Sequence, residues 1–192
     1  EHLTKSGESK IVAACTYPAS PGMIVESDTE EVNAHRKLLL EMLFVEGNHV
    51  CPSCEKSGNC QLQAVAYHLG MLTPHFPHFY PARDIDASHP DVMLERNRCI
   101  LCELCVRASR DVDGKNVFGI GGRGIRARLI VNSASGRLAD TSLSETDRAA
   151  EVCPTGAIVR KRHGFTIPIG KRLYDHHDIA EVPVAGMERP KK

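Results

Sequence analysis

A run of three cysteines at fixed spacing constrains this chain more than any other feature. Cys99, Cys102 and Cys105 lie in the segment RCILCELCVR, with two residues between successive cysteines. A short loop that runs into a helical turn can direct three thiolates at this spacing toward one compact group. A single tetrahedral zinc ion more often uses pairs of cysteines, because the middle cysteine of such a triplet is crowded. The spacing therefore favours a 4Fe–4S cluster over one zinc ion.

The fourth ligand of this cluster is expected at Cys153, which Pro154 follows in the segment EVCPTGAI. Two-cluster bacterial ferredoxins carry the pattern C-x2-C-x2-C-x3-C-P twice, and each fourth cysteine binds the cluster of the other copy. In the first copy here, Ser109 stands at the fourth position. Counting back from Cys153, the second copy lacks its three other cysteines, at Leu143, Thr146 and Ala149. The pattern therefore predicts one cluster in a degenerate two-cluster frame.

A second group of soft or borderline ligands lies upstream, in EGNHVCPSCEKSGNCQLQ. It consists of His49, Cys51, Cys54 and Cys60. Three cysteines and one histidine also form a known zinc set, so the local pattern leaves zinc and iron–sulfur both open. The neighbouring 4Fe–4S motif favours a second 4Fe–4S cluster here. A neutral imidazole in place of one thiolate makes such a cluster less negative, and that raises its reduction potential.

Composition excludes several classes of function. The formal net charge of the 192 residues is zero, which offers no electrostatic basis for binding nucleic acid. The longest apolar stretch, Leu38–Val45, is short and interrupted by Glu41, so it cannot span a membrane. No secretory signal pattern opens the chain, and the eight cysteines are clustered, as expected for metal ligands in a reducing cytoplasm.

Helical patterns flank the upstream ligand group. We expect a helix from Glu30 to about Val45, with Thr29 as its N-cap. A second helix is expected over Cys60–Leu69, capped by Asn59. The apolar face of the first helix is expected to consist of Val32, Leu39, Leu40, Met42 and Leu43.

The remaining segments are expected to be short elements and loops. His75 and His78 lie in a proline-rich connector, Met71–Pro81, and their spacing matches no metal site. The expected elements that follow are a strand pair at Val117–Ile120 and Arg126–Asn132, a short helix at Glu145–Val152 capped by Ser144, and a strand at Gly156–Val159. The last segment, 160–192, contains no cysteine and is expected to be a docking tail.

These motifs together resemble an iron–sulfur region that three protein groups share. The resemblance rests on EGNHVCPSCEKSGNCQLQ, ERNRCILCELCVR and CPTGAI. The groups are the large peripheral-arm subunit of respiratory complex I, the NAD-dependent formate dehydrogenases, and the small iron–sulfur (gamma) subunit of NAD-reducing bidirectional nickel–iron hydrogenase. His49 stands two residues before Cys51, and the sequence stops soon after GFTIPIGKRLYD. Both features look like the hydrogenase group.

The resemblance also gives Cys15 an expected role. In the family a plant-like 2Fe–2S domain precedes this region, and its last ligand lies in a strand similar to IVAACT. Cys15 matches that position, in an expected short strand at Ile11–Cys15. Its three partner ligands would lie before Glu1, so either a preceding segment supplies them or this variant has lost the cluster.

The expected fold class is therefore α+β, in three parts. Residues 1–29 are expected to be the C-terminal remnant of a 2Fe–2S β-grasp domain. Residues 30–83 are expected to form a small helical domain with a His/Cys3 4Fe–4S cluster. Residues 84–192 are expected to form a degenerate ferredoxin-like 4Fe–4S domain with the docking tail.

The resemblance implies an electron-transfer subunit of a cytoplasmic oxidoreductase complex. Its clusters relay electrons between a flavin/NAD-binding diaphorase subunit and the small and large nickel–iron hydrogenase subunits. The chain itself has no identifiable general base, nucleophile or open catalytic metal position, so we expect no catalytic residues. Two alternatives stay open: the iron–sulfur part of a formate dehydrogenase or complex I subunit, and a zinc-stabilised adaptor without redox activity.

Overall fold

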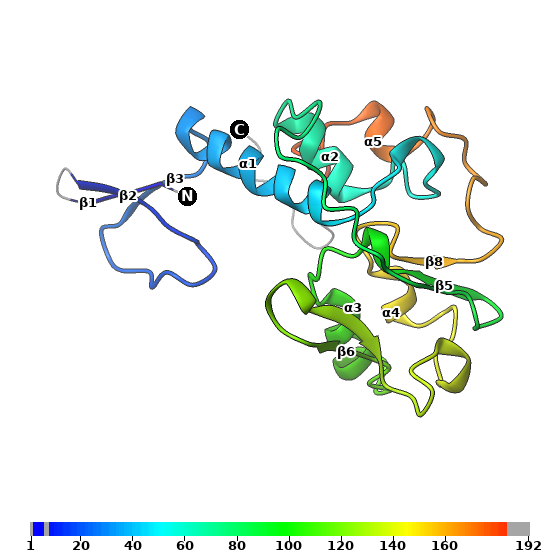
Figure 1. Cartoon of the computed structure of the whole chain (residues 1–192). Helices are drawn as coiled ribbons and strands as arrows, with labels where there is room; N and C mark the ends of the chain where they lie inside the picture. Colours follow the sequence, from blue (N-terminus) through cyan, green and yellow to red (C-terminus); the bar gives the residue numbers. More distant parts are fainter. Residues whose placement is uncertain (1, 6–7, 184–192) are drawn as a thin grey trace.

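The computed structural model describes residues 2–5 and 8–183, which form short strands and helices in three regions (Figure 1). The helices are α1 Glu30–Glu46, α2 Gln61–His68, α3 Leu104–Arg107, α4 Arg148–Glu151 and α5 Leu173–His176. The strands are β1 His2–Lys5, β2 Glu8–Ile11, β3 Ile24–Glu26, β4 Ile85–Asp86, β5 Val92–Glu95, β6 Phe118–Gly121, β7 Arg128–Val131 and β8 Ile158–Arg160. This mixture of helix and sheet agrees with the α+β class expected from the sequence.

The N-terminal sheet has the order β2-β1-β3, and both pairings are antiparallel. The expected strand at Ile11–Cys15 is wrong beyond its first residue, because β2 ends at Ile11. The backbone N–H groups of Thr16 and Tyr17 both donate to the Ala13 carbonyl oxygen at 3.1 Å, which closes a turn. Cys15 lies in that turn and is exposed.

Helix α1 begins as predicted, since the Thr29 hydroxyl accepts a hydrogen bond from the Val32 backbone N–H at 3.2 Å. Its expected apolar face is only partly correct. Leu39 and Met42 are 64% and 45% exposed, whereas Leu40 is buried against α2. The core between these helices consists of Leu40, Leu62, Ala66 and Met71. Only one side of a helix can contact a short partner helix, so apolar residues on the other sides of α1 stay exposed.

The second core lies between the sheet β4-β5-β8 and the hairpin β6-β7. The hairpin follows the predicted pairing, with Phe118 opposite Val131. Phe118, Val92 and Leu94 are fully buried. Cys105 is part of this core, and Cys99 and Cys153 pack against it, so the same apolar cluster holds three of the predicted ligands.

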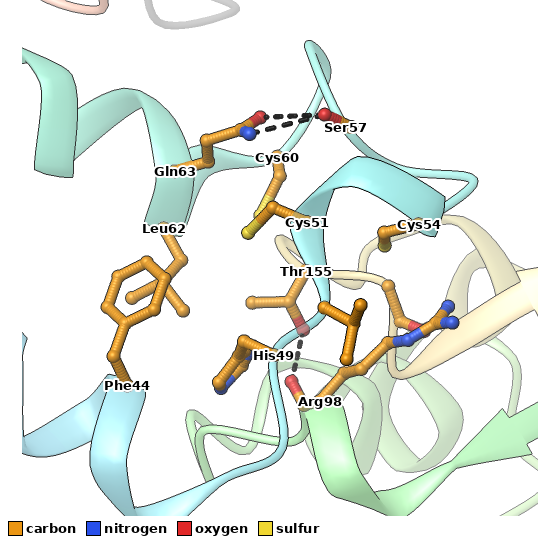
Figure 2. Close-up of a pocket in the computed structure, with 12 residues that line it drawn as sticks. Phe44, His49, Cys51, Cys54, Ser57, Cys60, Leu62, Gln63, Arg98 and Thr155 are labelled. Atoms are coloured by element: carbon orange, nitrogen blue, oxygen red, sulfur yellow. Dashed lines mark hydrogen bonds between the residues drawn. The ribbon is translucent and has the colours of Figure 1, made fainter. Parts of the chain in front are cut away.

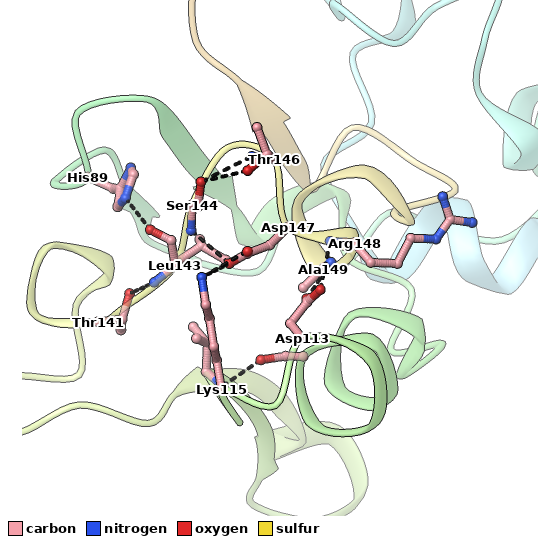
Figure 3. Close-up of polar contacts among 12 residues, drawn as sticks. His89, Asp113, Lys115, Thr141, Leu143, Ser144, Thr146, Asp147, Arg148 and Ala149 are labelled. Atoms are coloured by element: carbon pink, nitrogen blue, oxygen red, sulfur yellow. Dashed lines mark hydrogen bonds and ion pairs between the residues drawn. The ribbon is translucent and has the colours of Figure 1, made fainter.

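Helix α4, which precedes Cys153, does not begin as predicted. It starts at Arg148, and the preceding residue is Asp147 rather than Ser144. The carboxylate of Asp113 accepts hydrogen bonds from the backbone N–H groups of Arg148 and Ala149 at 2.9 and 3.0 Å (Figure 3). Asp147 instead forms an ion pair with Lys115 at 2.8 Å. A carboxylate 35 residues away thus caps this helix, which local sequence does not reveal.

The segment containing α5 packs against the loop between Cys51 and Cys60. The Tyr174 backbone N–H donates to the Gly58 carbonyl oxygen at 2.8 Å, and that of Leu173 donates to Asn59 Oδ1 at 3.1 Å. Asn59 was expected to cap α2, but Cys60 occupies the N-cap position and makes no side-chain cap. The rest of the expected tail, residues 184–192, lies outside the described residues.

No helix in residues 2–5 and 8–183 is both long and apolar enough to cross a membrane.

Candidate metal centres

The upstream ligand group surrounds a single cavity between the ends of α1 and α2. Its walls include the four predicted ligands His49, Cys51, Cys54 and Cys60. Figure 2 shows these side chains around Thr155, which comes from the distant segment that follows Cys153. The cavity contains about 350 Å³ of space not filled by atoms, part of it open to solvent. The fold therefore brings these four residues together, as their spacing predicted.

The His49 side chain has a distinctive environment in this cavity. Among buried side-chain nitrogen and oxygen atoms of the described residues, only His49 Nε2 lacks a hydrogen-bond partner. Burial lowers the pKa of His49 to about 4, which keeps the imidazole neutral at physiological pH. A buried polar atom without a partner costs about 1–3 kcal/mol. A bond to a metal would satisfy it, because neutral imidazole is a common metal ligand.

The downstream group surrounds a second cavity. Cys99, Cys102, Cys105 and Cys153 all line it, together with apolar side chains such as Ile120 and Leu129. It contains about 350 Å³ of space not filled by atoms. The structure thus brings Cys153 next to the triplet, across about fifty residues of sequence.

The backbone around Cys102 is strained in a way that suits this cavity. Leu101 and Glu103, on either side of Cys102, both adopt left-handed conformations, with φ of 55° and 60°. Side chains other than glycine rarely adopt this conformation, and each instance costs about 1–3 kcal/mol. The two residues let the chain turn twice within the motif, so that Cys99, Cys102 and Cys105 can face one space.

Burial raises the pKa of five ligand thiols and so favours their neutral form without a bound metal: Cys51, Cys60, Cys99, Cys102 and Cys105. It raises the pKa of Cys60 to about 11 and that of Cys105 to about 12. The nearby Cys153 thiol further raises the pKa values of Cys99, Cys102 and Cys105. A metal reverses this preference, because it binds the thiolate and releases the proton.

Both cavities bring four potential metal ligands to one space. Across the described parts of the chain, no three His, Cys, Asp or Glu side chains are arranged to hold a single metal ion. Each set of four ligands faces a shared space. The downstream space is lined mainly by apolar side chains, whereas the upstream lining also includes polar residues and Arg98. Four soft or borderline ligands around one space fit the donor set of an iron–sulfur cluster.

A thin wall separates the two cavities, and none of the sequence motifs indicated a role for its residues. Thr155 is 2% exposed and lines both cavities. Its hydroxyl donates to the Arg98 carbonyl oxygen at 2.8 Å and lies 3.6 Å from Cys153 Sγ. A Cβ on Gly156 would lie 2.9 Å from Cys54 Sγ. The only local signal for these residues was their position directly after Cys153-Pro154.

The loop that contains Cys54 and Cys60 is further held by Arg172, which is 3% exposed. The Nη1 atom of Arg172 donates to the carbonyl oxygens of Glu55 at 2.7 Å and Ser57 at 2.6 Å.

The predicted ligand Cys15 lies apart from both cavities, exposed in its turn. His176 and His177, at the end of α5, are exposed.

Two protein families match this chain. Residues 36–75 match the NADH-ubiquinone oxidoreductase-G iron-sulfur binding region, a range that contains His49 and the first three ligand cysteines. Residues 92–159 match the 4Fe-4S single cluster domain, a range that contains the second four cysteines. The two matches coincide with the two cavities.

Several known proteins are similar along most of the chain. The gamma subunit of the NAD-reducing hydrogenase HoxS from Cupriavidus necator is 41% identical, over 93% of this chain and 76% of that subunit. A chain in the crystal structure of an NAD+-reducing NiFe-hydrogenase in the H2-reduced state superimposes with a TM-score of 0.84. It is 58% identical, and the match covers 91% of this chain and 74% of that one.

Subunits of respiratory complex I are more distant relatives. The 78 kDa subunit of mitochondrial NADH-ubiquinone oxidoreductase from Candida albicans is 32% identical. The match covers 81% of this chain but only 21% of that subunit. The similarity to complex I is therefore confined to one part of a much longer protein.

Proposed function

This chain belongs to the family of NAD-reducing hydrogenase gamma subunits, and on that premise we propose that it conducts electrons through iron–sulfur clusters. It is a subunit of an oxidoreductase complex. The observation that carries this proposal is the convergence of two sets of four soft ligands on two separate buried cavities. Neither a zinc-stabilised adaptor nor a complex I or formate dehydrogenase fragment is favoured by the relatives.

The ligand assignment is part of the proposal. Cys99, Cys102, Cys105 and Cys153 would hold one 4Fe–4S cluster. His49, Cys51, Cys54 and Cys60 would hold a second, and the buried unpartnered Nε2 of His49 supports this set. Cys15 would ligate a 2Fe–2S cluster only with residues outside the printed sequence.

A bound 4Fe–4S cluster accepts and releases one electron at a time. The residues of this chain contribute the environment. Apolar side chains in the cavity walls limit contact with water, and the charges near each cavity influence how easily its occupant is reduced. The thin wall at Thr155 keeps the two sites close, which favours direct transfer between them.

We further propose the partners and reaction of the complex. The relatives are subunits of hydrogenases that reduce NAD, so the reaction proposed for the complex is H2 + NAD+ → H+ + NADH. In this scheme the chain lies between a nickel–iron hydrogenase module and a flavin/NAD-binding subunit. The cytoplasm is its proposed compartment, because clustered free thiols need a reducing environment.

The division of the chain also stays a proposal, with boundaries near residues 29 and 83. The N-terminal sheet would be what remains of a 2Fe–2S domain. The middle region would carry the His/Cys3 cluster, and the last region would carry the ferredoxin-like cluster. Contacts between α5 and the Cys51–Cys60 loop join the last two regions.

Metal analysis of anaerobically purified protein, together with EPR after reduction, tests the proposal. The two ligand sets predict about eight irons per chain and two reducible 4Fe–4S signals. Zinc at about one or two ions per chain, in a colourless protein without an EPR signal, would refute electron transfer. A protein with about four irons would show that only one ligand set binds a cluster.

A further inference from the structure

Arg98 precedes the ligand Cys99 in the chain, but its side chain belongs to the other cavity. It lines the space surrounded by His49, Cys51 and Cys54 (Figure 2). Only 17% of the side chain is exposed. Arg98 directly precedes a ligand of the downstream cavity, but its guanidinium faces the upstream cavity. Its position in the sequence therefore does not show which site its charge affects.

Glu55 holds the guanidinium in this position. Arg98 Nη1 lies 2.6 Å from Glu55 Oε2, and 29% of the Glu55 side chain is exposed. A weaker contact, at 3.4 Å, joins the same nitrogen to the Gly156 carbonyl oxygen. Partly buried charges are screened less by water and salt than surface charges, so both act strongly on their neighbours.

The pair thus places a fixed positive charge at the upstream cavity and a negative charge directly behind it. Arg98 interacts electrostatically with Cys51, Cys54 and His49. Arg107 provides a contrast at the downstream cavity, since it interacts with Cys102 but its side chain is exposed. The wall residue Thr155 fixes the Arg98 backbone through its hydrogen bond.

We propose that Arg98 sets the reduction potential of the group held by His49, Cys51, Cys54 and Cys60, and that Glu55 opposes it. This inference rests on the proposed function. Reduction adds one electron to that group, breaks no bond and moves no proton. A positive charge nearby stabilises the added negative charge and raises the potential. Arg98 therefore makes this site easier to reduce than it would be without that charge.

Redox titration of the anaerobically purified protein, with the subunits that accompany it, tests this inference. EPR follows each signal, and dithionite with mediators sets the ambient potential. The signal that a Cys60→Ala variant lacks is assigned to the upstream cavity. At fixed ambient potential, Arg98→Gln should lower the reduced-to-oxidised ratio of that signal about tenfold, which equals about 59 mV for one electron. Arg98→Lys should restore most of the shift.

Two further variants complete the design. Glu55→Gln removes the opposing charge, so it should raise the ratio of the same signal. Arg107→Gln makes the same charge change as Arg98→Gln beside the downstream cavity and should leave the upstream signal unchanged.

If Arg98→Gln loses iron, the opposite shift in Glu55→Gln still carries the test. The inference is overturned if Glu55→Gln lowers or does not change the ratio, or if Arg98→Gln shifts only the downstream signal. Absence of both signals from the unmodified protein would instead refute the proposed function.

Discussion

Arg172 Nη1 donates a hydrogen bond to the Ser57 carbonyl oxygen at 2.6 Å, across 115 residues of sequence. The same nitrogen reaches the Glu55 carbonyl oxygen at 2.7 Å, and Nε reaches that of Ile167 at 2.8 Å. The ring of Phe165 lies 5.4 Å from the guanidinium carbon. One buried side chain thus satisfies three carbonyls and ties the C-terminal segment to the loop between Cys54 and Cys60.

We expect Arg172→Met to weaken the upstream metal site selectively. The substitution leaves the carbonyl oxygens of Glu55 and Ser57 without their donor, which costs about 1–3 kcal/mol each. Iron content should fall from about eight toward about four per chain, since only one ligand set is affected. Iron analysis with EPR of both signals measures this. Lys171→Met, at an adjacent exposed position, is the control and should keep full iron content. Equal loss of both signals in Arg172→Met would contradict a local role.

Ligand spacing made the candidate sites predictable, whereas their supporting residues were not. Cys99, Cys102 and Cys105 lie within one short segment, and a known pattern links them to Cys153-Pro154. Arg172 and Asp113 act across more than thirty residues, and nothing in their local sequence indicates which backbone groups they bind. The side chain of Arg98 lines one cavity and its sequence neighbour Cys99 lines the other, so position in the sequence does not show which site this charge affects.

Local sequence signals predicted some secondary-structure features correctly and missed others. The Thr29 cap and the pairing of β6 with β7 were predictable because capping and hairpin formation depend on neighbouring residues. The extent of the apolar face of α1 was not, because Leu39 and Met42 look as apolar as Leu40. Which of them is buried depends on where the short helix α2 packs. The strand predicted to reach Cys15 failed because an unforeseen turn closes on Ala13.

Replacement of His49 should change the upstream site without removing it. His49→Cys places a thiolate where a neutral imidazole lies, so the occupant gains negative charge and becomes harder to reduce. We expect retained iron and a lower midpoint potential for the upstream signal in an EPR-monitored titration. His176→Cys makes the same change at an exposed position and should alter neither signal. An unchanged upstream potential in His49→Cys would mean that His49 is not a ligand.

Gly156 should tolerate no side chain. A Cβ there would lie 2.9 Å from Cys54 Sγ and 3.2 Å from both Cδ and Nη1 of Arg98. We therefore expect Gly156→Ala to displace Cys54, to destabilise the protein by about 1–3 kcal/mol, and to reduce iron at the upstream site. Thermal unfolding and iron analysis measure these effects. In Gly119→Ala the new Cβ would meet only ordinary contacts, at 3.4 Å and beyond, so this control should remain close to the unmodified protein.

Thiol accessibility should separate Cys15 from the seven cysteines proposed as ligands of the two cavities. In the printed 192-residue chain Cys15 is exposed, whereas the other cysteines are buried or half-buried. We expect iodoacetamide to modify one thiol per iron-loaded chain rapidly, and none rapidly in Cys15→Ser. Removing iron with a chelator under oxidant-free, denaturing conditions should make the remaining seven reactive, because they are then released from the metal and from burial. Mass spectrometry of the intact protein counts the modified thiols.

Rapid modification of several cysteines in the iron-loaded protein would contradict the ligand assignment. Protection of Cys15 in a longer chain with residues before Glu1 would instead support its place in a 2Fe–2S cluster.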